Sequence, residues 1–416
     1  MNALRVILVT PRFWPLFGGP EDAVAELAVG LKRCGAQPTV VTARWEPHWS
    51  PQLVYAHVPV IRLPHPHTRS WGSLRYLIAL ARWLRTHRRE IDLVYLVGSG
   101  HEASVARSVL HGSGIPIVVR PEIPLDVRGK RPSPWRLRQR CYAADAAIVA
   151  DLGTARALAE AGLPQRMIHR IADGIPEATI QHAGDRSEAR AALAEINPML
   201  TVPAEAKVVA CTGRLSKGRG LLRLIEAWQP LSQRWPGTRL WLVGDGPFRE
   251  TLYARLGDLD LRLAVHMPGS FDDLSDVLAA ADLLVEPGGE SISPHVMLQA
   301  GCLQRPVVGC NLETLRQTPL LEAGTALFAS PLDVAALRQA IVEMLDHPPS
   351  ADTLAAARQR VVREFSSGAM LDEHLWLFEQ LCGSSKANQT VQHDPQEVML
   401  NEACDQRPGA QREDSP

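Results

Sequence analysis

The stretch that decides the fold runs from 208 to 309 and alternates short apolar runs with amphipathic segments. One apolar run ends in the turn Thr212-Gly213-Arg214-Leu215-Ser216-Lys217-Gly218, and the next ends in Gly244-Asp245-Gly246-Pro247. Strands that alternate with helices predict a parallel sheet covered on both faces. Loops that follow the carboxyl ends of such strands meet at one edge of the sheet, where ligands bind. Cations, glycines and a helix amino terminus at this edge suit a diphosphate.

Three loops supply the chemistry of this edge. Arg214 offers a planar fork to phosphate oxygens and Lys217 a mobile point charge, although both are also compatible with solvated loop cations. The turn 244–247, with Gly244 and Gly246, serves first to reverse the chain before a helix. A third loop, Pro287-Gly288-Gly289-Glu290-Ser291, leads into a helical segment at His295. A diphosphate held here is the chemistry of a nucleotide-sugar donor site.

The N-terminal half repeats the alternation of strands and helices. Apolar residues recur at helical spacing between 24 and 31 and between 74 and 81. The predicted strands are Arg5–Thr10, Pro38–Thr42, Val58–Leu63, Asp92–Val97, Ile115–Arg120, Ala146–Ala150 and Met167–Ile171. We therefore expect a second parallel sheet in this half.

The order and spacing of the C-terminal blocks resemble family 4 glycosyltransferases, which have the GT-B fold. The first strand, Gly18-Gly19-Pro20-Glu21 and the helical pattern after them resemble the family's N-terminal signature. The resemblance covers roughly residues 5–380. It implies an α/β fold of two Rossmann-like, doubly wound parallel-sheet domains facing a cleft. The expected divisions are an N-terminal acceptor-side domain 1–180, a linker 181–205, a donor-nucleotide domain 206–350, bracing C-terminal helices 351–382 and a disordered tail 383–416.

The resemblance also implies an activity. Family members of the retaining kind transfer a hexose from a nucleoside-diphosphate sugar to an acceptor hydroxyl of a glycan or glycolipid. Gly18 and Gly19 would face the donor diphosphate and the acceptor, and the residues after the turn 244–247 would flank the nucleotide base. Arg214 and Lys217 would stabilise the departing diphosphate, so we expect no metal and no cofactor beyond the co-substrate. The turn with Lys217 is two residues shorter than is usual in the family, and Arg219 is an alternative cation.

The sequence departs from the family at two acidic positions. Relatives carry two glutamates separated by seven residues, where this chain has Ser291 and Gln299. Gln299 keeps an acceptor and donors for ribose hydroxyls, and losing charge assistance there costs on the order of 1 kcal/mol. Glu290 lies one residue before the first family position. It reaches the sugar ring if the loop bulges by one residue, and otherwise it is a surface acid.

Two further candidates lie in the N-terminal half. His101 begins a helix after a predicted strand, and Glu122 follows the strand that ends at Arg120. Relatives often place a histidine near the sugar at the second of these places. Both residues are candidates for the catalytic edge, although single polar residues at loop ends are more often solvated.

Composition and charge set the broad class. The 416 residues are 46% hydrophobic and 21% charged, which is typical of a soluble globular protein with two domains. No stretch reaches about 18 uninterrupted apolar residues, and the start shows no signal-peptide pattern. Seven cysteines without a Cys-x-x-Cys pair predict reduced thiols in a cytoplasmic protein.

The net charge of −1 conceals a basic half. Residues 1–180 contain 23 Lys and Arg against 14 Asp and Glu, a balance of +9. Two basic segments with aromatic residues, 71–89 and 128–140, carry much of it. Such surfaces suit anionic lipid headgroups, which predicts a peripheral position on the inner face of the plasma membrane. An anionic acceptor is an alternative ligand for these segments, and a solvated face is slightly favoured over both. Nucleic acid is disfavoured because no nucleic-acid-binding motif accompanies the charge.

Two other functions remain open at this point. A catalytically impaired relative serving as a binding or accessory subunit of a glycan-assembly complex would explain Ser291 and Gln299. A nucleotide-sugar epimerase on the same fold has no distinctive feature in this sequence and ranks lowest.

Overall fold

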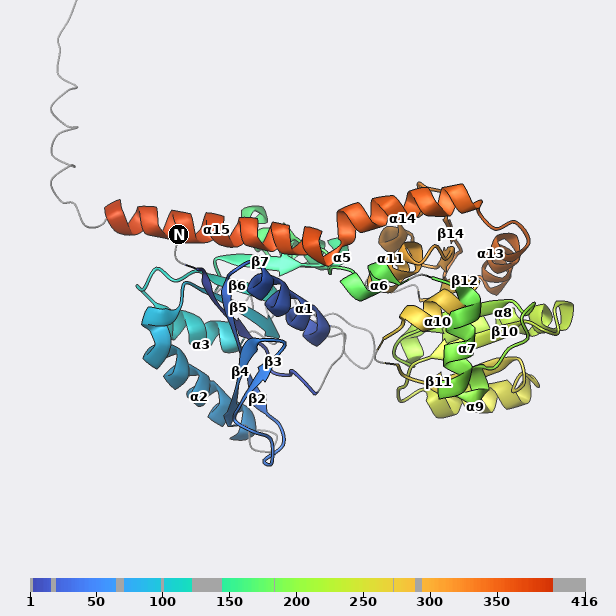
Figure 1. Cartoon of the computed structure of the whole chain (residues 1–416), viewed down its shortest axis with the longest axis horizontal. Helices are drawn as coiled ribbons and strands as arrows, with labels where there is room; N and C mark the ends of the chain where they lie inside the picture. Colours follow the sequence, from blue (N-terminus) through green and yellow to red (C-terminus); the bar gives the residue numbers. More distant parts are fainter. Residues whose placement is uncertain are drawn as a thin grey trace, which may run out of the picture.

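The computed structural model describes residues 3–15, 20–64, 71–98, 101–121, 144–182, 184–271, 273–288 and 294–391, and the structural statements below refer to these. The chain forms two α/β domains that lie side by side along the longest axis of the molecule (Figure 1). The two C-terminal helices run along one side of both domains, one helix over each (Figure 1).

The first domain is built on a sheet of eight described strands in the order β3-β4-β2-β1-β5-β6-β7-β8. Neighbouring strands are parallel except β3, which pairs antiparallel with β4 at the edge. The seven strands predicted from the sequence are present, whereas β3 was not predicted. The bounds are β1 Arg5–Val9, β2 Gln37–Arg44, β3 Gln52–Tyr55, β4 Val58–Pro64, β5 Leu93–Gly98, β6 Ile117–Pro121, β7 Ala146–Val149 and β8 Ile168–Arg170.

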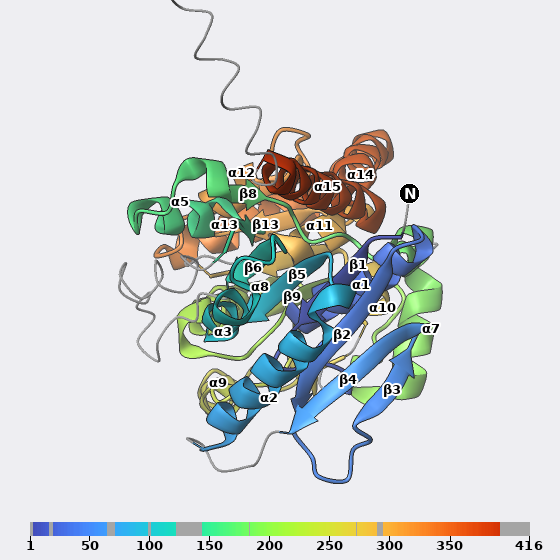
Figure 2. The same cartoon turned by 90° about the vertical axis from the view of Figure 1, so that its left-hand side faces the viewer.

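Helices cover both faces of the first sheet, as the views in Figures 1 and 2 show. Alternate side chains of β1 point to opposite faces, so Ile7 packs in one core and Leu8 in the other. The core around Ile7 is closed by α2 (Trp71–His87), α3 (His101–Leu110) and α5 (Leu152–Glu160). The core around Leu8 is closed by α1 (Pro20–Arg33) and by α15 (Ser367–Val391).

The second domain has a parallel sheet of six described strands in the order β11-β10-β9-β12-β13-β14. The strands are β9 Val208–Thr212, β10 Arg239–Val243, β11 Val265–Gly269, β12 Leu283–Glu286, β13 Val307–Gly309 and β14 Ala326–Phe328. One face is covered by α8 (Leu221–Arg234), α9 (Arg249–Asp258) and α13 (Val334–Asp346). The other is covered by α7 (Arg186–Ile196), α10 (Ser275–Ala280), α11 (His295–Cys302) and α14 (Ala351–Phe365).

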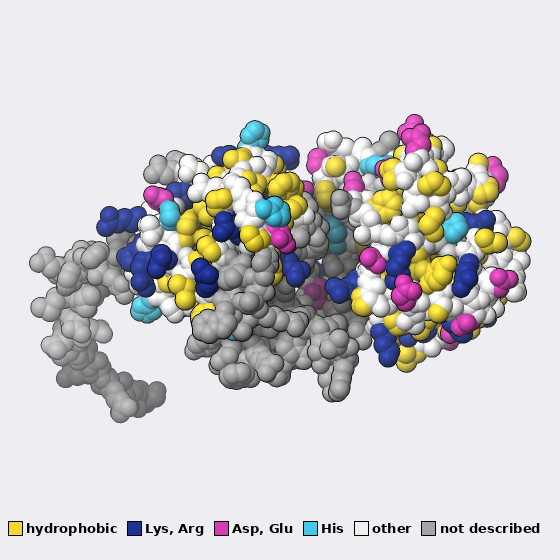
Figure 3. Space-filling model, turned by 90° about the horizontal axis from the view of Figure 1, so that it is seen from below, with side chains coloured by type: hydrophobic (Ala, Val, Ile, Leu, Met, Phe, Trp, Pro, Cys, Tyr) yellow, Lys and Arg dark blue, Asp and Glu magenta, His cyan; other side chains and the backbone are white. Residues whose placement is uncertain are grey.

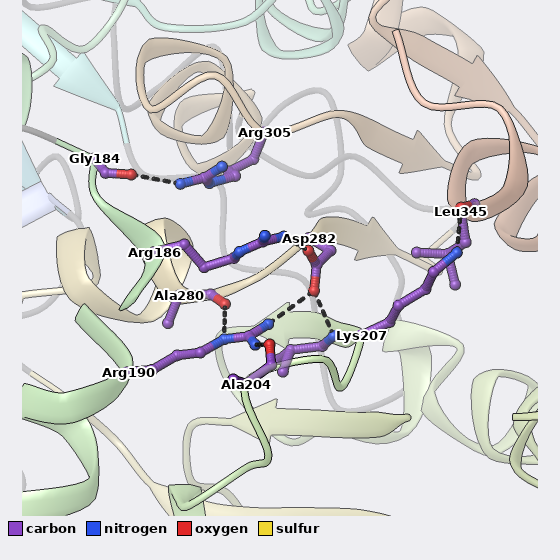
Figure 4. Close-up of polar contacts among 10 residues, drawn as sticks. Gly184, Arg186, Arg190, Ala204, Lys207, Ala280, Asp282, Arg305 and Leu345 are labelled. Carbon is purple, nitrogen blue, oxygen red and sulfur yellow. Dashed lines mark hydrogen bonds and ion pairs between the residues drawn. The ribbon is translucent and has the colours of Figure 1, made fainter. Parts of the chain in front are cut away.

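The segment 181–205, expected as a linker, is folded onto the second domain. Ala189 and Leu193 of α7 are buried with β9 in one hydrophobic cluster. Figure 4 shows that Arg186 and Arg190 both point toward Asp282, which precedes β12. Arg190 is 8% exposed and makes a 2.9 Å ion pair with Asp282. Polar and apolar contacts thus make α7 part of the second domain.

The chain crosses between the domains twice, and the two crossings touch. The outward crossing precedes α6 (Glu177–Gln181), and the return lies between α14 and α15. Ile175 accepts a 3.0 Å hydrogen bond from the Ser367 amide and donates a 2.7 Å bond to the Phe365 carbonyl. Gly174 packs so closely there that a Cβ would lie 2.5 Å from the Ser367 Cα. The two chain segments that connect the domains are therefore hydrogen-bonded to each other.

The last described helix extends beyond its predicted end. α15 continues to Val391, whereas the sequence predicted that the disordered tail begins at 383; residues 392–416 lie outside the described residues. Within the described part of the chain, no helix combines the length and apolar character needed to cross a membrane.

Candidate functional site

The second sheet reverses its strand order between β9 and β12. After β9 the chain continues to β10 on one side, and after β12 it continues to β13 on the other. Ligands of doubly wound sheets bind outside the carboxyl ends of the strands at such a switch point. The residues that leave these two strands are 213–220 and 287–288, and they form the candidate site.

Two of the predicted donor-site turns are locked to each other by their backbones. The Gly213 amide donates a 2.8 Å hydrogen bond to the Val243 carbonyl, and the Leu215 amide donates a 3.0 Å bond to the Asp245 carbonyl. A Cβ at Gly244 would lie 2.1 Å from the Gly213 carbonyl oxygen. The turns can approach this closely only because Gly244 lacks a side chain.

Gly246 has a similar role one turn further along. A Cβ on this residue would lie 2.4 Å from the Leu215 carbonyl oxygen. Gly213 itself has a φ of 108° and Gly244 a φ of 143°, which residues with side chains rarely adopt. The glycines therefore fix a rigid backbone edge next to the cations.

Three cations lie on this edge in different surroundings. Arg214 and Lys217 are exposed, Lys217 at the start of a short 3₁₀ turn, Lys217–Arg219. Arg219 points back into the sheet edge, where its Nη2 donates to the Thr212 carbonyl at 2.8 Å and to Glu286 Oε2 at 2.6 Å. The side chain of Arg219 is 19% exposed. Arg219 is thus the cation held at the switch point, while Arg214 and Lys217 face solvent beside it.

Glu286 is a site residue that the sequence analysis did not single out. It ends β12 and is 0% exposed. Burial raises the pKa of its carboxyl to about 7, although Arg219 opposes this rise. An acidic residue that ends the otherwise apolar run Leu-Leu-Val-Glu was the available signal, because a buried strand end rarely carries an unpaired acid.

The remaining predicted donor residues are only partly described. Gln299 is half-buried on α11, whose first residue, His295, follows the switch-point loop. Glu290 and Ser291 lie outside the described residues, so the bulge that would bring Glu290 to a sugar ring stays a prediction.

The first domain contributes a small pocket at the carboxyl ends of β5 and β6. Gly98, Glu102, Arg120 and Pro121 line it. The Arg120 Nη2 makes a 2.5 Å ion pair with Asp173 Oδ1, and both side chains are largely buried. This pair compensates the charge of Arg120 and ties the pocket to the outward crossing of the chain.

Of the site residues predicted in the first domain, one lies beside this pocket and the others are not described. His101 is exposed at the start of α3, beside the pocket residue Glu102, which is 6% exposed and was not predicted. Gly18, Gly19 and Glu122 lie outside the described residues, and their roles stay predictions.

Comparisons with known proteins agree with this geometry. Residues 18–174 match the family model of the glycosyl transferase 4-like domain, and residues 206–347 match glycosyl transferases group 1. The chain is 31% identical over 179 residues to the lipopolysaccharide core biosynthesis glycosyltransferase LpsE of Rhizobium meliloti, covering 43% of this chain and 51% of that protein. It is 32% identical over 168 residues to the glycogen synthase of Mycobacterium tuberculosis, covering 40% of each. The chain thus spans about half the length of these curated relatives or less.

Solved structures share the architecture over nearly the whole chain. The sucrose-phosphate synthase of Thermosynechococcus elongatus superposes with a TM-score of 0.76 at 20% identity, covering 92% of this chain and all of that one. Anabaena HepE in complex with UDP-glucose superposes with a TM-score of 0.72 at 19% identity, covering 91% and 100%. The predicted GT-B fold is therefore confirmed. Each half of the chain thus matches a glycosyltransferase domain model, and the two halves are joined in a GT-B fold.

Proposed function

We propose that the chain is a retaining glycosyltransferase that moves a hexose from a nucleoside-diphosphate sugar to an acceptor hydroxyl of a glycan or glycolipid. The observation that carries this proposal is the switch point of the second sheet, where Arg214, Lys217 and Arg219 gather beside a glycine-rich backbone edge. HepE, a structural neighbour, is described in complex with UDP-glucose, which supports the same donor class here.

The cations act on the leaving group in this proposal. Negative charge develops on the departing diphosphate in the transition state, and fixed cations and backbone amides stabilise it without reorganisation. Arg214 and Lys217 supply the uncompensated charge, because Arg219 is paired with Glu286. No metal ion or cofactor is needed for this step in the proposal.

The other predicted residues would bind the donor and face the acceptor. Gln299 would bind the ribose hydroxyls as a neutral donor and acceptor, and Glu290 would stabilise positive charge on the sugar ring. His101 and Glu122 would face the acceptor from the first domain. Domain closure would exclude the water that otherwise hydrolyses the donor.

Arg214→Ala tests the donor site directly. We expect binding of UDP-glucose to weaken by about 1.5–3 kcal/mol, the range for hydrogen bonds to charged groups. Isothermal titration calorimetry, extended to other nucleotide sugars, measures this change. Arg234→Ala is the matched control, because Arg234 is an exposed cation at the opposite end of α8. If the Arg214→Ala variant binds UDP-glucose as tightly as the wild type, the proposed donor site at the switch point of the second sheet is wrong.

Turnover separates a transferase from a binding subunit. Release of nucleoside diphosphate from a panel of donors, with and without membrane extract, is expected in the wild-type chain. A chain that binds nucleotide but transfers and hydrolyses nothing would instead be the accessory subunit. The matched relatives are named for transferase or synthase activities, which does not favour that alternative.

We further propose that α2 places the protein on an anionic membrane surface on the cytoplasmic side. Leu74 and Ile78 are 50% and 53% exposed, and they lie on the same helix as exposed arginines. These are Arg75, Arg82 and Arg85, with Arg88 and Arg89 just after the helix. Figure 3 shows dark-blue basic side chains gathering on the first domain, at the left.

Two aromatic residues of α2 do not lie on its exposed basic face. Tyr76 is 3% exposed and lies in the core, and Trp83 is half-buried and stacks on His87. The apolar contact with lipid would therefore come from Leu74 and Ile78. The second basic segment, 128–140, lies outside the described residues.

Vesicle binding tests this surface. The wild-type chain is expected to cosediment with phosphatidylglycerol vesicles at low salt and to dissociate as salt increases, since each cation near the surface contributes about 1 kcal/mol. The double variant Leu74→Asp with Ile78→Asp should lose this binding. Leu263→Asp, at an 86% exposed position of the second domain, should keep it. Salt-insensitive or absent binding of the wild type would count against a peripheral role.

A further inference from the structure

The Arg219–Glu286 pair lies at the switch point of the second sheet, between β9 and β12. Glu286 is the last residue of β12, and Arg219 precedes α8, whose N-cap Gly220 lies against the Pro287 backbone. The pair is joined by one 2.6 Å contact, from Arg219 Nη2 to Glu286 Oε2. It therefore sits where the donor diphosphate is proposed to bind.

The pair leaves hydrogen-bonding capacity unused. Glu286 Oε1 and Arg219 Nε are buried and have no hydrogen-bond partner among the described residues. Buried polar atoms without partners are rare, because each costs about 1–3 kcal/mol. Two such atoms on one ion pair at a ligand-binding edge point to a group whose hydrogen bonding or protonation changes during function.

Besides Arg219, the Thr212 backbone acts on the Glu286 carboxyl, and both lower its pKa against the effect of burial. Cys211 of β9 and Cys310 after β13 lie on either side of Glu286, and Arg223 of α8 acts on Cys310. Burial raises the pKa of both thiols, so neither carries charge near neutral pH. Arg219 keeps its charge throughout this range, because Glu286 raises the already high pKa of its guanidinium. Glu286 is thus the group in this cluster whose protonation changes near neutrality.

We propose that Glu286 positions Arg219 for an incoming diphosphate, and that a proton on its carboxyl decides whether the pair meets the diphosphate as neutral or singly positive. This inference rests on the proposed donor site. Glu286 acts through Arg219 and is a positioning residue, since nothing places it against the sugar or the reacting atoms.

Two charge states follow from the geometry. With Glu286 ionised, the pair is neutral, and the carboxylate repels the anionic donor at short range. With Glu286 protonated, Arg219 keeps its contact through a neutral acceptor, and the site gains one positive charge. Because the pKa of Glu286 is about 7, both states are populated near neutral pH.

The coupling between donor binding and protonation of Glu286 determines how the affinity changes with pH. A bound diphosphate disfavours the carboxylate and raises the pKa of Glu286, so donor binding and protonation favour each other. Affinity should therefore fall as the pH rises through neutrality. One pKa unit of coupling corresponds to a tenfold change in affinity, so we expect a decline of about tenfold between about pH 6 and pH 8.5.

UDP-glucose is the probe for the binding experiment. Its diphosphate is esterified at both ends and so lacks the phosphate pKa near 6 of a monoester, unlike free UDP. The wild-type chain should bind it more weakly at about pH 8.5 than at pH 6, by about tenfold. Glu286→Gln keeps an acceptor for Arg219 without the charge, so it should bind with little pH dependence and about as tightly as the wild type at pH 6. Glu226→Gln, which alters the more exposed pair with Arg255, should retain the wild-type profile.

A measurement without ligand separates this inference from the donor function. The pKa of Glu286 is raised above its ordinary value of 4.5, so the folded chain holds a proton that the unfolded chain has lost. The wild type should therefore lose stability relative to Glu286→Gln as the pH rises from 5 to about 7, with no further relative change above that. Chemical denaturation at each pH measures this difference. Equal pH profiles of the two proteins would overturn the inference.

The outcomes remain distinguishable. Binding of UDP-glucose with the same pH profile in the wild type and Glu286→Gln overturns the positioning inference and leaves the donor site standing. Failure of every nucleotide sugar to bind at any pH removes the donor function, and this inference with it. If Glu286→Gln does not fold, Arg219→Lys replaces it: a lysine lacks the planar fork, so affinity should fall severalfold while the pH dependence persists. A pH-independent Arg219→Lys would contradict the role of Glu286.

Discussion

Gly244→Ala is expected to lower the free energy of unfolding by about 4 kcal/mol, a loss typical of strained backbone positions that also lack space. The new Cβ would lie 2.1 Å from the Gly213 carbonyl oxygen, and this neighbour is backbone, which cannot swing aside. The φ of 143° at Gly244 adds strain for any residue with a side chain. Urea denaturation followed by circular dichroism measures the loss.

Gly237→Ala is the matched control for this change. No atom lies within 4 Å of a Cβ built at Gly237, so the free energy of unfolding should change by less than about 0.5 kcal/mol. Any folded Gly244→Ala protein should also bind UDP-glucose poorly, because separating the two turns moves Arg214. Stability equal to that of the control would show that the turns are not locked as described.

Asp282→Ala is expected to have a comparable effect, about 3–5 kcal/mol, through a different mechanism. Asp282 accepts from the Val208 amide at 2.7 Å and from Arg190 at 2.9 Å, and it pairs with Arg186 (Figure 4). Removing it leaves the buried charge of Arg190 without a counter-ion, which costs far more than an intact pair contributes. The loss would be seen as a lower urea midpoint of the second domain.

Asp346→Ala controls for the loss of an ordinary ion pair. Asp346 pairs with Arg234, whose side chain is 55% exposed, so solvent screens the interaction. We expect a change of less than about 1 kcal/mol. Similar effects in the two variants would show that the cluster around Asp282 is not what holds α7 on the sheet.

Most of the fold could be predicted because the strands of a doubly wound sheet are apolar over their whole length. The strand β3 could not, since Gln52–Tyr55 is short, half-exposed and formed by pairing with its neighbour β4. The segment 181–205 was predicted as a linker for a related reason. Its helix α7 is polar outside the few positions that pack on the sheet, and its place depends on Asp282, almost a hundred residues away.

The loops that form the candidate site could be predicted from the sequence, but the ion pair between their residues could not. Glycines and exposed cations have local signals, and so Arg214, Lys217 and Gly244 were predicted. The partner of Arg219 is Glu286, 67 residues away along the chain, and only the parallel pairing of β12 with β9 brings them together. A short motif cannot reveal a contact made by sheet topology, whereas a charged residue ending an apolar strand is a signal to look for one.

The packing of α15 has a consequence for the order in which this chain can fold during synthesis. Met370, Leu371, Leu377 and Phe378 close the same core as Leu8 of the first strand. Domains usually fold as they leave the ribosome, amino-terminal part first. Here the core of the first domain stays open on one face until residues 367–391 have emerged, by which time the whole second domain has been made. The domain that is synthesised first is therefore completed last.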